Sequence, residues 1–203
     1  MTAGPTLTAD KIEGLVRRAQ AGDSAAFEQL VGYYKHRIYN YVLRMVGDPD
    51  TAEDIAQETF IRAYSSLASF RGASSIQTWL YRIASNLAID TMRRRKYRYN
   101  SFSLDEPLST LDSEVSRDIE DDTPGPQRQL QTRQLQQKVT DAIVQLSPKL
   151  RTVIILYELQ GMSYDEIAEI VGAPLGTIKS RLFNAREQLR ELLGDQIDLE
   201  AIG

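Results

Sequence analysis

The chain has 203 residues, of which 42% are hydrophobic, enough for one large or two small domains with cores of their own. It contains no cysteine and one histidine, which excludes disulfides, thiolate metal sites and a cysteine nucleophile and makes any metal centre improbable. No segment has the length of a signal peptide core or the roughly 18 apolar residues of a membrane span, so we expect a cytoplasmic protein.

The net charge of −4 hides a separation of charge along the chain. Taken alone, this net charge argues against a partner such as nucleic acid. Residues 104–126 contain eight acids and one base, whereas residues 79–100 contain six bases and one acid. Each segment therefore has to be judged by its own charge.

The first half of the chain predicts an all-helical domain. Apolar residues recur every three or four positions from Thr8 to about Lys96, with almost no alternating run of β-branched residues. Caps and breakers divide this stretch into four helices, over about 8–22, 23–47, 51–67 and 76–95, and the loop SFRGASS (69–75) precedes the last.

A linker follows the first domain. Residues 101–133 lose the helical period, gather Ser, Thr, Pro and acid, and contain the breaker TPGP at 123–126. The period resumes at Leu135, and Ser147-Pro148 starts a helix that ends near Gly161. We therefore predict an all-α protein of two small helical domains, 1–100 and 134–203, joined by a flexible acidic linker.

The stretch 163–186, SYDEIAEIVGAPLGTIKSRLFNAR, predicts two short helices joined by a turn. Ser163 and Glu166 have the spacing of a capping box, so a helix begins there. Gly172 suits the left-handed conformation that ends it, and Pro174 prevents simple continuation. Five apolar residues form the core face of the last helix: Ile178, Leu182, Ala185, Leu189 and Leu192. The arrangement is typical of a helix-turn-helix.

Four residues of the last helix lie off this apolar face, paired four positions apart: Lys179, Ser180, Phe183 and Asn184. A recognition helix presents such donors, acceptors and apolar groups to a DNA major groove. Three neighbouring arginines are candidates for phosphate contacts: Arg181, Arg186 and Arg190. The alternative is a solvated surface, which explains the charged residues but not Phe183.

The fourth helix carries a second unusual stripe beside its apolar face, namely Trp79, Arg82, Asn86, Asp90 and Arg93, followed by RRRKYR (93–98). Cations interleaved with an aromatic ring suit single-stranded nucleic acid. Two alternatives stay open, because Trp79 could complete the core and Asp90 could order the neighbouring arginines.

A third surface lies on the predicted helix 51–67. Asp54, Glu58 and Arg62 follow each other at intervals of four, with Gln57 beside them and the apolar positions elsewhere. Such a face is typically solvated, and docking to another protein is the alternative.

Four segments together resemble the extracytoplasmic-function (ECF) type of bacterial alternative sigma factor. They are DIAQETFIRAY (54–64), FRG with TWLYRIASN (70–72 and 78–86), LSPKLRTVIILYELQGMSYDEIAEIVG (146–172) and GTIKSRLFNAR (176–186). The resemblance implies a subunit that binds core RNA polymerase and directs it to promoters, for a stress or envelope-response regulon. It also implies an anti-sigma factor as a partner, and no catalytic activity.

The resemblance also implies roles for individual residues. Asp54, Gln57 and Glu58 would bind core polymerase. The melted minus-10 element would be held by Phe70, Arg71, Ser74, Ser75, Trp79, Arg82, Asn86, Asp90, Arg93 and Arg94. The minus-35 element would be read by Thr177, Lys179, Ser180, Arg181, Phe183, Asn184 and Arg186. Many relatives have arginine where this chain has Asn184, and an amide pairs well with adenine, so the preferred minus-35 sequence is open.

Other classes of protein compete with this interpretation. A helix-turn-helix regulator that works without being a polymerase subunit would bind duplex DNA alone, usually as a dimer. A helical adaptor would leave the RRRKYR cluster and Phe183 unexplained. An enzyme is the weakest option, because no set of side chains indicates a nucleophile, an acid–base pair, a metal or a cofactor.

Overall fold

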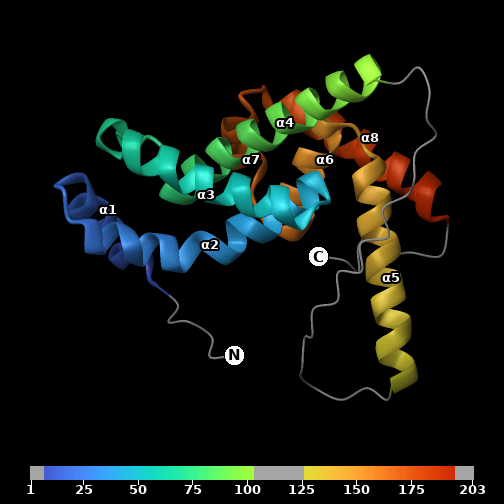
Figure 1. The fold of residues 1–203 in the computed structure, drawn as a ribbon, viewed down its shortest axis with the longest axis horizontal. Coiled ribbons are helices and arrows are strands. Elements are labelled where there is room, and N and C mark those ends of the chain that lie inside the picture. Colours follow the sequence, from blue (N-terminus) through green and yellow to red (C-terminus); the bar gives the residue numbers. More distant parts are fainter. Residues whose placement is uncertain (1–6, 103–125, 195–203) are drawn as a thin grey trace.

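The computed structural model describes residues 7–102 and 126–194, and these residues contain helices and no strand (Figure 1). The α-helices are α1 (Ala9–Gln20), α2 (Ser24–Val46), α3 (Pro49–Ser66), α4 (Ile76–Phe102), α5 (Pro126–Gln145), α6 (Pro148–Ile154), α7 (Tyr164–Val171) and α8 (Leu175–Leu193). A 3-10 turn, η1 (Leu67–Ser69), follows α3, and a π-helical segment, η2 (Ile155–Leu159), follows α6. The predicted all-α fold is confirmed.

Local capping explains where the helices of the first half begin and end. The carboxylate of Asp23 accepts the amide of Ala26 at the start of α2, and Gly47 ends that helix at a φ of 75°. Helix α3 begins at Pro49, two residues earlier than predicted. A proline usually ends the helix before it, but here Asp48 is the N-cap of α3 and Pro49 fits its first turn, where no amide partner is needed.

Two helices extend beyond the part that the apolar pattern predicted. Helix α4 continues from about Arg95 to Phe102, and α5 begins at Pro126 rather than near Leu135. Apolar periodicity marks the packed part of a helix, whereas a helix can continue where its side chains need no buried partner. Of the predicted linker 101–133, residues 103–125 lie outside the described residues.

Helices α1 to α4 form the first bundle, in which α2 packs against the other three. Its core includes three almost fully buried tyrosines, Tyr34, Tyr41 and Tyr81. The hydroxyl of Tyr41 lies 2.7 Å from that of Ser85, and the rings of Tyr41 and Tyr81 meet edge to face, with centroids 5.1 Å apart. Burial raises the pKa of both phenols well above the ordinary value.

Helices α5 to α8 form the second bundle, which contains the predicted helix-turn-helix. The capping box of α7 is present, because Ser163 accepts the amide of Glu166 and the Glu166 carboxylate accepts the amide of Ser163 at 2.9 Å. Gly172 ends α7 at a φ of 62°. Helix α8 then packs against α5, α6 and α7.

The two bundles share one continuous core. Helix α7 packs against α4, and α2 contacts α5, α6 and η2 (Figure 1). Hydrogen bonds cross the boundary, among them one from the Tyr81 hydroxyl to the Gln160 amide oxygen at 2.5 Å and one from the Arg151 guanidinium to the Met45 carbonyl. The Thr152 hydroxyl also donates to the Met45 sulfur at 3.7 Å. The structure therefore places both predicted domains in one closed arrangement.

Candidate nucleic-acid and polymerase interfaces

The outer face of α8 exposes to solvent the four residues that lie off the apolar face of this helix. Lys179, Ser180, Phe183 and Asn184 are all exposed, and 64% of Phe183 is accessible. The opposite face is packed, since Ile178, Leu182, Ala185 and Leu189 are buried as predicted. Leu192, predicted as part of that core, is instead 45% exposed, because the stripe leaves the bundle near the end of the helix. Neither bundle covers Phe183.

Three other predicted contact residues of α8 are less exposed than these four: Arg186, Arg181 and Thr177. Arg186 is half-buried and makes two hydrogen bonds, at 2.9 and 2.6 Å, to one carboxylate oxygen of Glu158 in η2. Its guanidinium also lies 5.3 Å from the ring centre of Tyr157, and the bond to Glu158 raises its pKa. Arg186 is thus bound to η2 in this structure. Arg181 and Thr177 are half-buried beside the exposed set.

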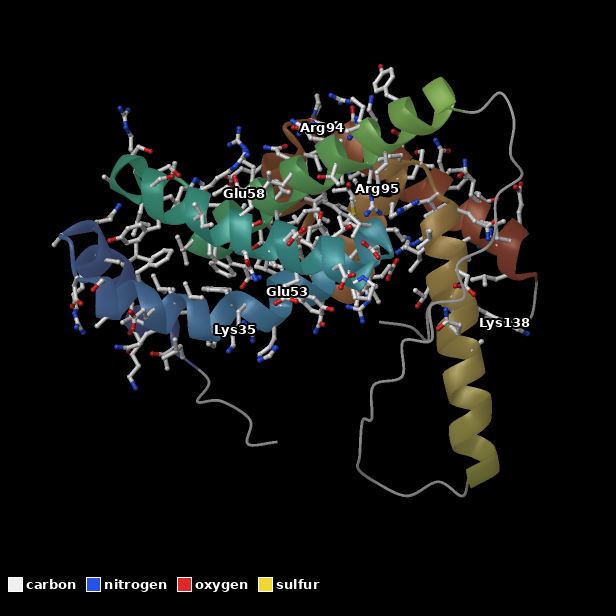
Figure 2. All side chains as sticks on the ribbon, viewed as in Figure 1. Lys35, Glu53, Glu58, Arg94, Arg95 and Lys138 are labelled. Atoms are coloured by element: carbon white, nitrogen blue, oxygen red, sulfur yellow. The ribbon has the colours of Figure 1, made fainter. Side chains whose placement is uncertain are left out.

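The stripe of α4 lies mostly in solvent. Arg82, Asn86, Asp90 and Arg93 are exposed, as is Arg94, which Figure 2 shows on the outer side of α4. The Asp90 carboxylate lies 3.6 Å from the Arg93 guanidinium, so it pairs with a neighbouring arginine of its own stripe. The alternative that Trp79 completes the core holds in part, because its ring is half-buried against the core.

Trp79 connects the stripe to the loop 70–75. Its ring packs on Phe70, with centroids 5.0 Å apart. Ser75 fixes the start of α4, because its hydroxyl accepts the amide of Thr78 at 3.0 Å. Arg71 and Ser75 are exposed, whereas Ser74 is half-buried. The contact between Trp79 and Phe70 therefore places the loop beside the stripe.

The sequence interpretation missed the residue that holds this loop. The side-chain amide of Gln20, at the end of α1, donates to the carbonyl of Phe70 at 2.6 Å and to that of Leu67 at 3.2 Å. These bonds span about fifty positions of sequence, and no local pattern marks Gln20 as their donor. Gln20 is therefore a positioning residue for the loop.

The third surface lies on α3. Asp54 and Gln57 are exposed and Glu58 is half-buried, with its carboxylate 2.7 Å from Arg62 (Figure 2). The structure adds two apolar residues that the sequence interpretation missed, because 62% of Ile61 and 55% of Tyr64 are accessible. Acidic groups beside exposed apolar side chains are typical of a protein-docking surface rather than a solvated face.

Comparison with known proteins assigns the two bundles. Residues 30–98 match the family model Sigma-70 region 2, and residues 136–189 match Sigma-70, region 4. The chain is 40% identical to the ECF RNA polymerase sigma factor SigW of Bacillus subtilis, over 91% of this chain and 97% of SigW. It is 39% identical to the RNA polymerase sigma-H factor of Pseudomonas aeruginosa, over 92% of this chain and 96% of that protein. The chain belongs to the ECF family of RNA polymerase sigma factors.

Solved structures agree with this assignment. The sigma factor RpoE of Bartonella quintana, crystallised with the anti-sigma factor NepR, superposes with a TM-score of 0.66 at 27% identity, over 84% of this chain and 98% of that one. CnrH, solved with the cytosolic domain of CnrY, shares the fold with a TM-score of 0.65 at 24% identity.

Membership of this family defines the activity. An ECF sigma factor acts with core RNA polymerase on promoter DNA to direct transcription initiation, and it is not an enzyme. The first bundle is region 2 and the second is region 4. Among residues 7–102 and 126–194, no helix combines the length and apolar character needed to cross a membrane.

Proposed function

We propose that this sigma factor reads promoters with two separate surfaces, the outer face of α8 for the minus-35 element and the stripe of α4 with its loop for the minus-10 element. The observation that carries the proposal is that Lys179, Ser180, Phe183 and Asn184 are exposed on a helix whose opposite face is packed. Phe183 is 64% accessible and lies among hydrogen-bonding side chains, and this combination of apolar and polar groups suits the thymine methyl groups and base edges of a major groove.

In region 4 the duplex is read from the amino-terminal half of α8. Lys179 donates to guanine or phosphate, and Ser180 and Asn184 bond base edges in the major groove. Phe183 contacts a thymine methyl group or a sugar. Thr177 and Arg181 lie beside these residues and contribute contacts to the backbone. Arg186 joins them only after its guanidinium leaves Glu158, so it acts first to hold α8 on η2.

In region 2 the non-duplex minus-10 strand runs along α4. Arg82, Arg93 and Arg94 attract the phosphates, and Asn86 hydrogen-bonds an unpaired base. Asp90 holds Arg93 in place through its ion pair.

The loop of region 2 supplies the pocket for a base that has left the stack. Phe70 and Trp79 form its aromatic wall, and Arg71, Ser74 and Ser75 supply polar contacts. Trp79 supports Phe70 from the core side, because the Trp79 ring itself is half-buried.

The α3 surface docks on core polymerase. Asp54, Gln57 and Glu58 provide its polar part, and the exposed Ile61 and Tyr64 provide apolar area that docking removes from water.

The remaining assignments follow from the family. We assign residues 1–100 to region 2, 101–133 to the acidic linker and 134–203 to region 4, which agrees with the matched ranges 30–98 and 136–189. The protein works in the cytoplasm, where polymerase is, and an anti-sigma factor restrains it, as in the RpoE complex with NepR. We place its regulon among stress or envelope responses.

Run-off transcription tests the proposal. Purified core polymerase is assayed with and without this chain on the DNA upstream of its own gene, and we expect initiation at one defined start site only when the chain is present. A helix-turn-helix regulator without a polymerase role would instead bind that DNA tightly as an isolated protein and leave core polymerase inactive. That result would overturn the proposal.

A further inference from the structure

A polar cavity lies between region 2 and region 4. Its volume is about 490 Å³. Helix α2 contributes Arg37, Asn40 and Arg44, helix α4 contributes Gln77 and Tyr81, and the end of η2 contributes Leu159 and Gln160. The size is that of a small-molecule site, and the wall comes from both halves of the protein.

The wall offers hydrogen-bond donors and positive charge, and no carboxylate lines it. Each guanidinium has five N–H donors, and the three amides add two each. Within the described part of the chain, no carboxylate lies within ion-pair distance of Arg37 or Arg44. Arg44 is half-buried, and desolvation lowers its pKa. Arg37 is exposed, with its guanidinium 4.5 Å from the ring centre of Tyr33. Two cations that line one cavity with no carboxylate near them favour an anionic ligand.

The spacing of the two arginines restricts the ligand. Arg37 and Arg44 are seven residues apart on α2, so they share a face of the helix at a separation of about 10 Å along its axis, with Asn40 between them. The cavity, at about 490 Å³, is also much larger than a single phosphate. A ligand with negative groups some distance apart can reach both guanidinium groups, and guanidinium recognises phosphate in a bidentate way.

The far wall is fixed by an unusual local structure. At the end of η2, the amide of Gln160 donates a hydrogen bond to the carbonyl of Ile155, five positions earlier, at 3.1 Å. This is the bonding pattern of a π-helix, and π-helical segments occur frequently at functional sites. The side-chain oxygen of Gln160 accepts the Tyr81 hydroxyl at 2.5 Å, so its NH₂ group remains as a donor.

We propose that this cavity binds a nucleotide-sized organic polyphosphate, with its negative groups on Arg37 and Arg44 and its polar remainder on the amides of Asn40, Gln77 and Gln160. Because region 2 and region 4 both contribute to the wall, the ligand stabilises the closed arrangement of the two regions over any arrangement in which they separate. The cavity is thus a site through which a small metabolite lowers the availability of the sigma factor.

Calorimetric titration of the full-length chain tests the site, with ATP and inorganic tripolyphosphate as probes and uncharged adenosine as the control ligand. We expect one equivalent of ATP or tripolyphosphate to bind and adenosine not to bind. Arg44→Met should weaken binding roughly tenfold or more, because it removes charge-assisted bonds. Lys35→Met removes a cation from an exposed position of the same helix outside the cavity and should leave the affinity unchanged (Figure 2).

A second variant tests the same site in case Arg44→Met does not fold. Gln160→Glu keeps an oxygen acceptor for Tyr81 but adds a negative charge to the cavity wall, so it should also abolish binding while the protein stays folded. Absence of binding by the wild-type chain, or equal loss with Lys35→Met, would overturn the proposal. Binding of a single-stranded oligonucleotide that Arg44→Met weakens to the same extent would assign the arginines to DNA and overturn it as well.

The linkage to domain closure has its own readout. The chain has no cysteine, so Glu28→Cys in α2 and Glu191→Cys in α8 give a pair of unique positions for fluorescent labels. The distance between the two labels is followed as urea is added. ATP should raise the urea concentration at which this distance increases, and it should have no such effect in the Arg44→Met variant. An unchanged midpoint in the wild-type background would refute the linkage. Transcription is not measured, so failure here leaves the role as a sigma factor intact.

Discussion

The guanidinium of Arg151, in α6 of region 4, donates a hydrogen bond to the backbone carbonyl of Met45, near the end of α2 in region 2. The same group also donates to the carbonyls of Val144 and of Leu146. These carbonyls lie at helix ends, where no amide further along the helix can reach them. Arg151 is only 6% exposed, and burial lowers its pKa to about 10. One buried cation therefore joins the ends of α2 and α5 across the boundary between the two regions.

Arg151→Met should loosen this boundary. Methionine preserves much of the apolar volume but leaves buried carbonyls without donors, so we expect the free energy of unfolding to fall by about 2 kcal/mol or more. Urea unfolding should also separate into two transitions, one for each region, because the regions lose a shared contact.

Arg190→Met is the matched control, since Arg190 is exposed on α8 and pairs with Glu187 three positions earlier on the same helix. Its cost should stay within about 0.5 kcal/mol. A wild-type-like single transition in Arg151→Met, with a cost no larger than that of the control, would show that Arg151 does not couple the regions.

This contact also shows what the sequence could not reveal. Caps and apolar periods are local, so the packed parts of the helices, the capping box at Ser163 and the buried face of α8 except Leu192 were predictable and are confirmed. Arg151 lies in the motif LSPKLRTVII, where nothing local distinguishes a buried arginine from a solvated one. Its partner Met45 is 106 positions away, and that pairing depends on how the two bundles meet.

The candidate surfaces were predictable to different degrees. The exposed set on α8 was correctly located, because an apolar stripe defines the opposite face of a helix. The partners of Arg186 in η2 and of Phe70 on α1 were not predictable, because each depends on a side chain from a distant helix. The roles of these surfaces in DNA and polymerase binding stay predictions, tested by the experiments that follow.

Phe183→Ala should impair promoter use without harming the fold. Phe183 is 64% exposed and packs into no core, so the free energy of unfolding should change by no more than about 0.5 kcal/mol. If the ring contacts a base or sugar at the minus-35 element, run-off transcription from minus-35-dependent promoters should fall several-fold, while binding of the chain to core polymerase is retained.

Leu192→Ala provides the control for loss of an exposed apolar side chain on the same helix, since Leu192 is 45% exposed near the carboxyl end of α8. It should leave transcription unchanged. Equal transcription by Phe183→Ala and the wild-type chain would remove Phe183 from the DNA interface.

Asn86→Ala should separate promoter opening from polymerase binding. Asn86 is exposed on the α4 stripe, on a different helix from the α3 docking surface, and it is not part of the buried core. We expect reduced permanganate reactivity of the melted minus-10 thymines and normal affinity for core polymerase. Glu58→Ala should give the reverse pattern, with weaker core binding. Parallel loss of both activities in Asn86→Ala would contradict its assignment to the unpaired strand.

Asp48 should make the stability of α3 depend on pH. Its carboxylate bonds the side chain and the amide of Thr51, the latter at 3.0 Å, and it lies 3.1 Å from the Arg95 guanidinium, which Figure 2 shows on the α3 side of α4. The bonds to Thr51 and, less strongly, Arg95 hold the pKa of Asp48 below its ordinary value. Asp48→Ala should therefore cost about 1 kcal/mol near neutral pH, the usual effect of losing a helix cap.

The sign of the pH dependence follows from the lowered pKa. The folded state favours the ionised carboxylate, so the charge-dependent stabilisation is complete above the unfolded pKa of about 3.9 and is lost as the pH falls through the lower folded value. In urea unfolding, the gap between the wild-type chain and Asp48→Ala should stay constant from neutral pH to about pH 5 and narrow below about pH 4. Asp50→Ala, which removes another carboxylate from the first turn of α3, controls for general charge near the helix start. A gap that keeps its full size in acid would show that the ionised form of Asp48 does not carry the stabilisation, and that the cap acts through the neutral carboxyl group alone.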